Sequence, residues 1–276
     1  MVILWGGAGM ISVKLNVFSD ILYMNSDLRI LFPDNIAKGE KLKTLWLCHG
    51  GSGDENDWLY HSTVAEIPDE YHMAVVCVNA EDSCFVDMVY GRSFTGYIGE
   101  ELPDILHKMF PHLSDAREDN YISGLSNGGY GCFVIGLTYP EKYAAIGAFS
   151  AGDKADAKYQ KSEGGEITPR IRMFGREDVK GTKFSVRQLA RDVSNRDCSK
   201  PRIYHACGSK DPWLDLNLLV KDTFEELNDC GYEYTYDQIE GLGHEWKFWD
   251  IELRRFLDKC LCRPKGVAEN TDGNAI

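Results

Sequence analysis

The chain has 276 residues, a formal net charge of −13 at pH 7 and a hydrophobic content of 43%. This length allows one large α/β domain or two small ones, and this hydrophobic content is enough for a full core without disulfides or metals. The acidic balance argues against nucleic acid as a partner, because phosphate binding needs a basic face, and no apolar run approaches the roughly 18 residues of a membrane span.

Two strands are predicted near the start of the chain, after a non-core extension over residues 1–9. Residues 11–17 alternate between apolar and polar with a period of two. This alternation is typical of an antiparallel edge strand with one wet face, and residues 27–33 are its expected partner.

Four short, mostly apolar runs follow, and helix-length segments separate them. They are TLWLCHG at 44–50, MAVVCVNA at 73–80, NYISGLS at 120–126 and AAIGAFS at 144–150. Strands buried on both faces have this composition, so the pattern predicts a mostly parallel sheet covered by helices on both faces.

Four amphipathic helices are predicted from apolar stripes at helical spacing. They cover residues 97–110, 127–138, 214–229 and about 246–261. Gly231 is the expected C-cap after the third helix.

Residues 153–200 break this rhythm, because they are polar, contain glycine and have little periodicity. A long irregular insertion in an α/β domain often serves as a lid over a site. We therefore expect a small polar cap here, within one domain that spans residues 10–262. Residues 263–276 carry no apolar pattern and are expected to form a flexible tail.

A glycine-flanked serine lies between a predicted strand and a predicted helix, in Gly-Leu-Ser-Asn-Gly at 124–128. In a G-x-S-x-G turn the serine backbone is strained, and its close neighbours must lack side chains. The turn lifts the hydroxyl to the edge of the sheet, where the helix N-terminus favours developing negative charge. Ser126 is therefore predicted to be a nucleophile, and a plain glycine-rich packing turn is the alternative.

A serine hydroxyl needs a base to attack near neutral pH. His244 lies in a glycine-bearing loop between a strand and the last helix, and such a loop can bring an imidazole over the serine. His205 lies inside the predicted strand 202–207 and is expected to be a core residue. His244 is the predicted base.

The base in turn needs a carboxylate that holds its tautomer and stabilises its charged form. Asp211 comes just after the strand 202–207 and is the predicted acid. Asp153, which follows the run AFSAG, is the alternative, and Asp215 is the third choice.

The tetrahedral intermediate of acyl transfer needs two N–H groups aimed at one oxygen. Asn127, the residue after the serine, supplies one. The His-Gly-Gly loop at 49–51 follows a buried strand and has nothing bulky to block its backbone, so Gly51 is the predicted second donor.

No metal site is predicted. The segment HEWKF at 244–248 lacks the second histidine of the zinc motif H-E-x-x-H, and no C-x-x-C pair occurs in the chain. The nine cysteines are odd in number and several lie in apolar runs, which is typical of reduced core thiols. Together with the absence of a recognisable secretory signal, this predicts a cytoplasmic protein.

Five segments together resemble one esterase branch of the α/β-hydrolases, which holds tributyrin-type and acetyl esterases, feruloyl esterases and S-formylglutathione hydrolases. They span roughly residues 10–262 and are LWLCHGGSGDENDWL, EELPDILHKMFP, YISGLSNGGYGCF, GSKDPWL and GHEWKFWD. The resemblance implies an α/β-hydrolase fold with about eight strands in a mostly parallel sheet.

The resemblance also implies a catalytic triad of Ser126, Asp211 and His244, in the chain order expected of α/β-hydrolases, with Gly51 and Asn127 as oxyanion donors. The sequence departs from the family in one place, because Asn127 stands where Met or Gln is usual. The backbone N–H is the same, so the difference concerns the wall of the pocket.

The expected activity is that of a serine carboxylesterase acting on short-chain acyl esters through an acyl-enzyme, with no cofactor. Carbohydrate-linked acetyl or feruloyl esters are candidate substrates. The alternative is a thioesterase of the S-formylglutathione type, and a remote alternative is an inactive hydrolase fold that serves as a binding module. The expected partner is a small-molecule ester, and self-association into a homo-oligomer is left open.

Substrate contacts are expected from the loops around the serine. Four tryptophans near these loops make a carbohydrate ester a candidate substrate, although aromatic side chains there are as often pocket walls or core residues. They are Trp58, Trp213, Trp246 and Trp249. The candidate contact residues are His49, Gly50, Trp58, Trp213 and Trp246.

Overall fold

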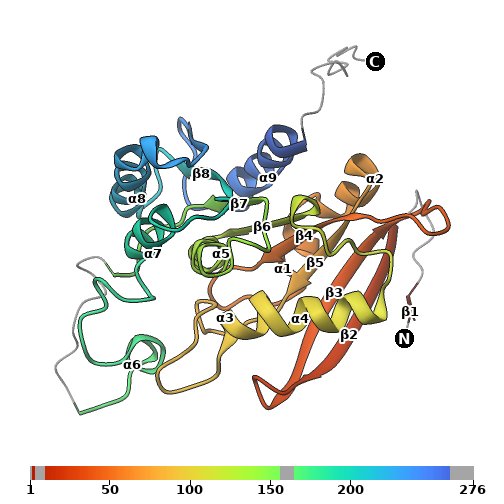
Figure 1. Ribbon diagram of the computed structural model, residues 1–276, viewed down its shortest axis with the longest axis horizontal. Coiled ribbons are helices and arrows are strands. Elements are labelled where there is room, and N and C mark those ends of the chain that lie inside the picture. Colours follow the sequence, from red (N-terminus) through yellow and green to blue (C-terminus); the bar gives the residue numbers. More distant parts are fainter. Residues whose placement is uncertain (1, 4–9, 156–164, 262–276) are drawn as a thin grey trace, which may run out of the picture.

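The computed structural model describes residues 2–3, 10–155 and 165–261, and in these ranges a nine-stranded sheet forms the centre of the molecule (Figure 1). The strand order is β1-β2-β3-β5-β4-β6-β7-β8-β9. The strands are β1 (Val2–Ile3), β2 (Met10–Ser19), β3 (Met24–Pro33), β4 (Lys43–Cys48), β5 (Met73–Val78), β6 (Asn120–Leu125), β7 (Ala145–Phe149), β8 (Arg202–Gly208) and β9 (Tyr234–Ile239).

The two halves of the sheet differ in strand direction. Strands β1, β2, β3 and β5 pair antiparallel. From β5 through β4 to β9 every pair is parallel. The prediction of a mostly parallel sheet with about eight strands is confirmed. A ninth, two-residue strand, β1, lies in the segment 1–9, which was expected to lie outside the core.

Burial follows this division in the inner strands, but not in the edge strand β9. All residues of β5 and β6 are buried, as expected for strands covered on both faces. In β2 the side chains of Lys14, Asn16 and Phe18 are exposed, which matches the alternation that predicted one wet face.

Helices cover both faces of the sheet (Figure 1). Alternate residues of each central strand point to opposite faces, so Trp46 and Cys48 of β4 join one core cluster and Leu45 and Leu47 join the other. The first cluster lies under α4 (Leu102–Met109), α5 (Asn127–Thr138), α7 (Val186–Ser194) and α8 (Leu214–Glu226). The second lies under α1 (Asp57–His61), α2 (Ile67–Tyr71) and α9 (Trp246–Leu261).

The predicted helices are present, with two local differences. Helices α5 and α9 begin and end where the sequence predicts. Helix α8 ends earlier, at Glu226, and Gly231, with a left-handed φ of 85°, caps the 3-10 turn Asn228–Cys230 that follows it. The segment 97–110 begins as a π-helical turn over Tyr97–Glu101 after α3 (Phe94–Gly96) and becomes α-helical only at α4. Pro103 has no N–H to donate to a preceding carbonyl, so the turn before it is free to widen.

The predicted cap contains more regular structure than its composition indicates. Its described part, residues 153–155 and 165–200, holds α6 (Pro169–Phe174) and α7. Helix α7 buries Val186, Leu189 and Val193 in the same core as α5 and α8. Helix α7 therefore belongs to the helical layer that covers one face of the sheet. A cap role for the rest of the segment stays a prediction.

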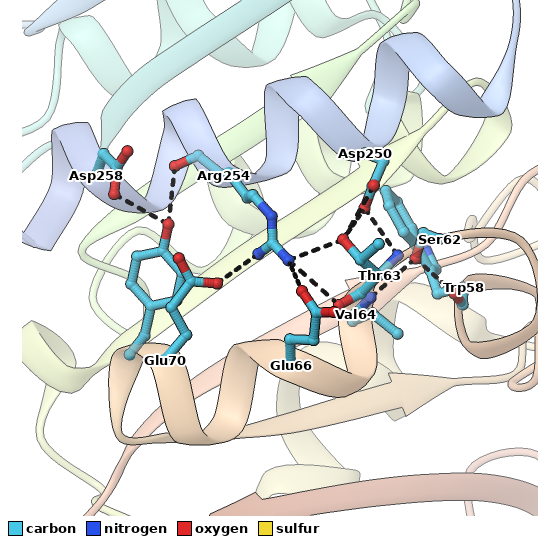
Figure 2. Close-up of polar contacts among 10 residues, drawn as sticks. Trp58, Ser62, Thr63, Val64, Glu66, Glu70, Asp250, Arg254 and Asp258 are labelled. Atoms are coloured by element: carbon cyan, nitrogen blue, oxygen red, sulfur yellow. Dashed lines mark hydrogen bonds and ion pairs between the residues drawn. The ribbon is translucent and has the colours of Figure 1, made fainter. Parts of the chain in front are cut away.

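A polar network fastens α9 to the segment around α1 and α2 (Figure 2). Arg254 donates hydrogen bonds to the carboxylates of Glu66 and Glu70 at 2.7 Å and to the hydroxyl of Thr63 at 2.8 Å. Asp250 accepts hydrogen bonds from both the N–H and the hydroxyl of Thr63 at 3.0 Å. These contacts fix the direction of α9 and with it the end of the loop that precedes the helix.

The remaining expectations about the chain ends fall largely outside the described residues. Residues 4–9 of the predicted extension and the predicted tail at 263–276 are not described. Within the described ranges, every helix is too short or too polar to span a bilayer.

Candidate active site

Ser126 lies at a sharp turn between β6 and α5. Its φ of 53° and ψ of −116° are strained for a residue with a side chain. Added methyl groups show why its neighbours are glycines: one on Gly124 would lie 2.8 Å from the carbonyl oxygen of Cys48, and one on Gly128 would collide with the carbonyl oxygen of His49. The turn is thus pressed against the end of β4, and the serine stands at the carboxyl edge of the sheet.

The structure brings Ser126, His244 and Asp211 together in one chain of hydrogen bonds. The His244 Nε2 lies 3.0 Å from the Ser126 Oγ, and the His244 Nδ1 lies 2.8 Å from the Asp211 Oδ2. Three different loops supply them, after β6, β8 and β9. A hydroxyl, an imidazole and a carboxylate in this order and at these distances can activate the hydroxyl as a nucleophile.

The Asp211 carboxylate is buried and yet held in its charged form. Burial by itself raises the pKa of Asp211, but hydrogen bonds from His244, from the Ser150 hydroxyl and from the Trp213 N–H lower the pKa below its ordinary value overall. The Trp213 N–H lies 2.9 Å from the Asp211 Oδ1. An ionised carboxylate at the His244 Nδ1 favours the tautomer whose Nε2 can accept the serine proton.

The two other candidate acids lie elsewhere. Asp153 is completely buried, and it accepts hydrogen bonds from the Ser185 hydroxyl at 2.9 Å and from the Arg187 N–H at 3.1 Å. It thereby anchors the start of α7. Asp215 lies in the first turn of α8.

The loop after β4 lies against the serine turn. An added methyl group on Gly51 would lie 2.8 Å from the Asn127 Nδ2, and one on Gly50 would lie 2.6 Å from the Leu125 Cδ1 and 4.0 Å from the Ser126 Cβ. The backbones of Gly51 and Asn127, the two predicted oxyanion donors, therefore belong to neighbouring segments on the same side of the site.

Two predicted substrate contacts are core residues in the structure. The His49 ring is 1% exposed; its Nδ1 lies 2.6 Å from the Gly50 carbonyl oxygen, and its Nε2 accepts a hydrogen bond from the Ala80 N–H at 3.1 Å. Burial lowers the pKa of His49, which favours the neutral ring. Trp58 is also 1% exposed and donates to the Cys48 carbonyl oxygen. Both side chains pack against the loop after β4 from the protein interior.

Of the other predicted contacts, Trp213 borders the site and Trp246 belongs to an aromatic stack. A cavity of about 180 Å³ is lined by Ser126, Asn127, Ser150, Lys154, Trp213 and Leu216. Trp246 packs edge-on against Trp58 and Trp249, with ring centroids 5.3 Å apart in both pairs. A larger cavity of about 290 Å³ is lined by residues of α5 and of the segment 181–196, and no triad residue lines it.

Sequence reasoning missed Ser150, Lys154 and Leu216 in the cavity, and it placed Trp249 near the site without its contact with the imidazole. The position of Ser150 gave one usable signal, since it follows β7 at the same sheet edge as Ser126. Trp249 reaches the imidazole from α9, and no sequence signal predicts that contact. Within the described ranges no group of three or more His, Cys, Asp or Glu side chains is arranged to hold a metal ion.

The model of a family of esterases, described as "Putative esterase", matches residues 19–259. The chain belongs to this esterase family. It is 30% identical over 256 residues to an acetyl esterase from Caldicellulosiruptor saccharolyticus, a match that covers 86% of this chain and 93% of that enzyme.

Solved structures of other members of this esterase fold agree. The fluorophosphonate-binding serine hydrolase FphF from Staphylococcus aureus superposes with a TM-score of 0.81 at 28% identity, covering 92% of this chain and 99% of FphF. An S-formylglutathione hydrolase, FrmB, from the same organism gives 0.79 at 28% identity, with 91% and 99% covered. The esterase is a serine carboxylesterase with the α/β-hydrolase fold, and both predictions are confirmed.

Proposed function

We propose that this esterase hydrolyses short-chain acyl esters through an acyl-enzyme formed on Ser126. The observation that carries the proposal is the continuous chain from the Ser126 Oγ through His244 to Asp211, with contacts of 3.0 and 2.8 Å. It joins a nucleophile, a general base and an orienting carboxylate without any intervening group.

In the first half of the reaction, the Ser126 Oγ attacks the ester carbonyl carbon and passes its proton to the His244 Nε2. The carbonyl oxygen becomes an oxyanion, and the main-chain N–H groups of Asn127 and Gly51 donate to it. The N-terminus of α5 adds a favourable field at the same place. Collapse of the intermediate breaks the ester C–O bond, and His244 gives its proton to the departing alcohol.

In the second half, water replaces the alcohol. His244 removes a proton from the water, whose oxygen attacks the acyl carbonyl, and the same N–H groups stabilise the second oxyanion. Collapse returns the proton from His244 to the Ser126 Oγ and releases the carboxylic acid. Asp211 stays ionised throughout and stabilises the charged imidazole in both halves.

Small acyl groups fit the site best. The cavity beside Ser126 has a volume of about 180 Å³, below the roughly 300–1,000 Å³ of sites for drug-sized ligands. Trp213 and Leu216 form the apolar part of its lining, and Asn127, Ser150 and Lys154 form a polar part. Acetyl to butyryl groups are the proposed range.

A series of p-nitrophenyl esters tests this range. Each CH₂ that enters an apolar pocket adds about 0.8 kcal/mol of binding, so a long trough would give a kcat/KM that rises steadily with chain length. We expect kcat/KM to fall beyond about four carbons, because the cavity is then full. A kcat/KM for the palmitate at or above that for the butyrate, measured below micelle formation, contradicts the proposal.

The same chemistry acts on thioesters, and the likeness to an S-formylglutathione hydrolase supports that second candidate. The likeness to an acetyl esterase supports an oxygen ester of acetate. A panel of S-formylglutathione, acetylated xylan and methyl ferulate separates these substrates. We expect the highest kcat/KM on acetate esters, and a value at least tenfold higher on S-formylglutathione would favour the thioesterase.

We also propose a reducing, cytoplasmic location. Its support is that the eight cysteines of the described ranges are free thiols, six of them buried. Self-association into a homo-oligomer stays a prediction.

A further inference from the structure

Ser150 joins the triad from an unusual backbone position. It follows β7, is 3% exposed and has a left-handed φ of 54°. Its N–H donates to the Ala206 carbonyl oxygen of β8 at 2.8 Å, so its backbone is fixed between two strands. A glycine would adopt this φ without steric cost, whereas a residue with a Cβ is strained. The contacts of the Ser150 hydroxyl offset that strain.

The direction of those contacts follows from which groups can donate. The Trp249 Nε1 lies 3.0 Å from the Ser150 Oγ, and an indole nitrogen can only donate. The Ser150 oxygen therefore accepts from Trp249, which leaves its own hydrogen to be given to the Asp211 carboxylate, whose pKa the Ser150 hydroxyl helps to lower. An ionised carboxylate can only accept, so the series Trp249 to Ser150 to Asp211 has one consistent direction.

Trp249 also contacts the base. Its ring stands edge-on to the His244 imidazole, with centroids 5.0 Å apart and planes at 90°. His244 is hydrogen-bonded to Asp211 at 2.8 Å, and Trp249 contacts both His244 and Ser150. Donation from Ser150 to Asp211 then closes a circuit of four residues. Such a circuit limits the rotation of both the carboxylate and the imidazole.

We propose that Ser150 is a positioning residue of the triad: it holds the Asp211 carboxylate at the angle that His244 needs, and Trp249 holds the Ser150 hydroxyl. This inference rests on the proposed roles of Ser126, His244 and Asp211. It adds to the triad a fourth residue, whose effect on turnover passes through the acid.

The first test compares Ser150→Gly with Ser150→Ala. A hydrogen bond to a charged group is worth enough that its loss lowers kcat by about tenfold to a hundredfold. Any change in KM reports instead the place of Ser150 in the lining of the substrate cavity. We expect both variants to lose kcat to a similar extent. If residue 150 mattered only for its backbone conformation, Ser150→Gly would keep the wild-type kcat, because glycine adopts this φ without strain. That result overturns the proposal.

A matched control is available in β6. Ser123 is fully buried, and among the described residues its hydroxyl has no hydrogen-bond partner. Ser123→Ala is expected to leave kcat within about twofold of the wild type. Trp249→Phe keeps a ring beside His244 but removes the N–H, and we expect a smaller loss in kcat, about threefold, in the same direction. An unchanged kcat in Trp249→Phe contradicts its part in the circuit.

A double-mutant cycle with Asp211→Asn tests the route of the effect. If Ser150 acts through Asp211, Ser150→Gly lowers kcat by less than about twofold once Asp211 is replaced. A full tenfold or larger loss on top of Asp211→Asn overturns the positioning role while leaving the triad intact. An Asp211→Asn enzyme with wild-type kcat instead overturns the proposed triad itself, and the inference with it.

Discussion

The backbone of Gly51 passes so close to Asn127 that an added methyl group on Gly51 would lie 2.8 Å from the Asn127 Nδ2. Real Cβ atoms essentially never approach another heavy atom so closely. The two segments that carry the proposed oxyanion donors are therefore fitted to each other, and the absence of a side chain at residue 51 allows the fit.

Gly51→Ala is expected to lower kcat by about tenfold or more, because the added methyl group displaces the two donors relative to each other. The Asn127 amide is the end of a side chain and can move, so the protein should stay folded. The double variant Gly51→Ala/Asn127→Ala removes the collision and should recover most of the loss. Gly165→Ala is the control, since its methyl group would meet nothing within 4 Å. Equal kcat in Gly51→Ala and Gly165→Ala would argue against Gly51 as a donor.

Asp211→Asn and Asp153→Asn should separate chemistry from stability. Asparagine at residue 211 favours the wrong tautomer of His244, and kcat should fall by about 10⁴-fold. Asp153 instead accepts from Ser185 and Arg187, so its replacement should cost about 1–3 kcal/mol and lower Tm by roughly 2–10 °C, with kcat within about threefold. Steady-state kinetics and thermal unfolding of both variants check this, and the opposite assignment of the two defects would place the acid on Asp153.

The serine turn, the acid and the base could be predicted because each depends on local order along the chain. Ser126 is marked by glycines between a strand and a helix, and Asp211 and His244 each follow a strand end. The burial of His49 and Trp58 could not be predicted, because it depends on contacts with residues far away in the sequence, such as Ala80 and Trp246. Helix α7 was missed although its buried residues Val186, Leu189 and Val193 recur at helical spacing, because the polar residues of the surrounding segment dominate its composition.

The contact between Ser150 and Trp249 was hidden for a related reason. Nothing in the sequence relates a serine after β7 to an indole in α9, and only the crossing of the chain at the sheet edge brings them together. Residues that act through others are thus harder to predict than those that take part in the chemistry, because no motif spacing connects them.

Stability should depend on pH through Glu252. This fully buried side chain accepts a hydrogen bond from the Tyr204 hydroxyl at 2.7 Å. Burial raises the pKa of Glu252 from 4.5 to about 7, although the hydrogen bond from Tyr204 and the charge of Arg255 act against the rise. The folded state therefore binds this proton more tightly than the unfolded state does, and the contribution of Glu252 to the free energy of unfolding falls as pH rises from about 4.5 to about 7, by at most about 3 kcal/mol.

Glu252→Gln removes this titration. The free energy of unfolding of the variant minus that of the wild type should therefore increase between pH 5 and pH 8, as measured by urea denaturation at each pH. A difference that stays constant across this window, or one that decreases, would contradict a raised pKa of Glu252 in the folded state.

The central claim is that catalysis passes through a covalent bond to Ser126, and peptide mapping after reaction with a fluorophosphonate tests it most directly. We predict one adduct per chain, located on Ser126, with esterase activity lost in proportion to labelling. The Ser126→Ala variant should remain folded, take up no label and lose activity by about 10⁴–10⁶-fold. An adduct on another residue, or a folded Ser126→Ala enzyme with a tenth of the wild-type activity, would contradict the account.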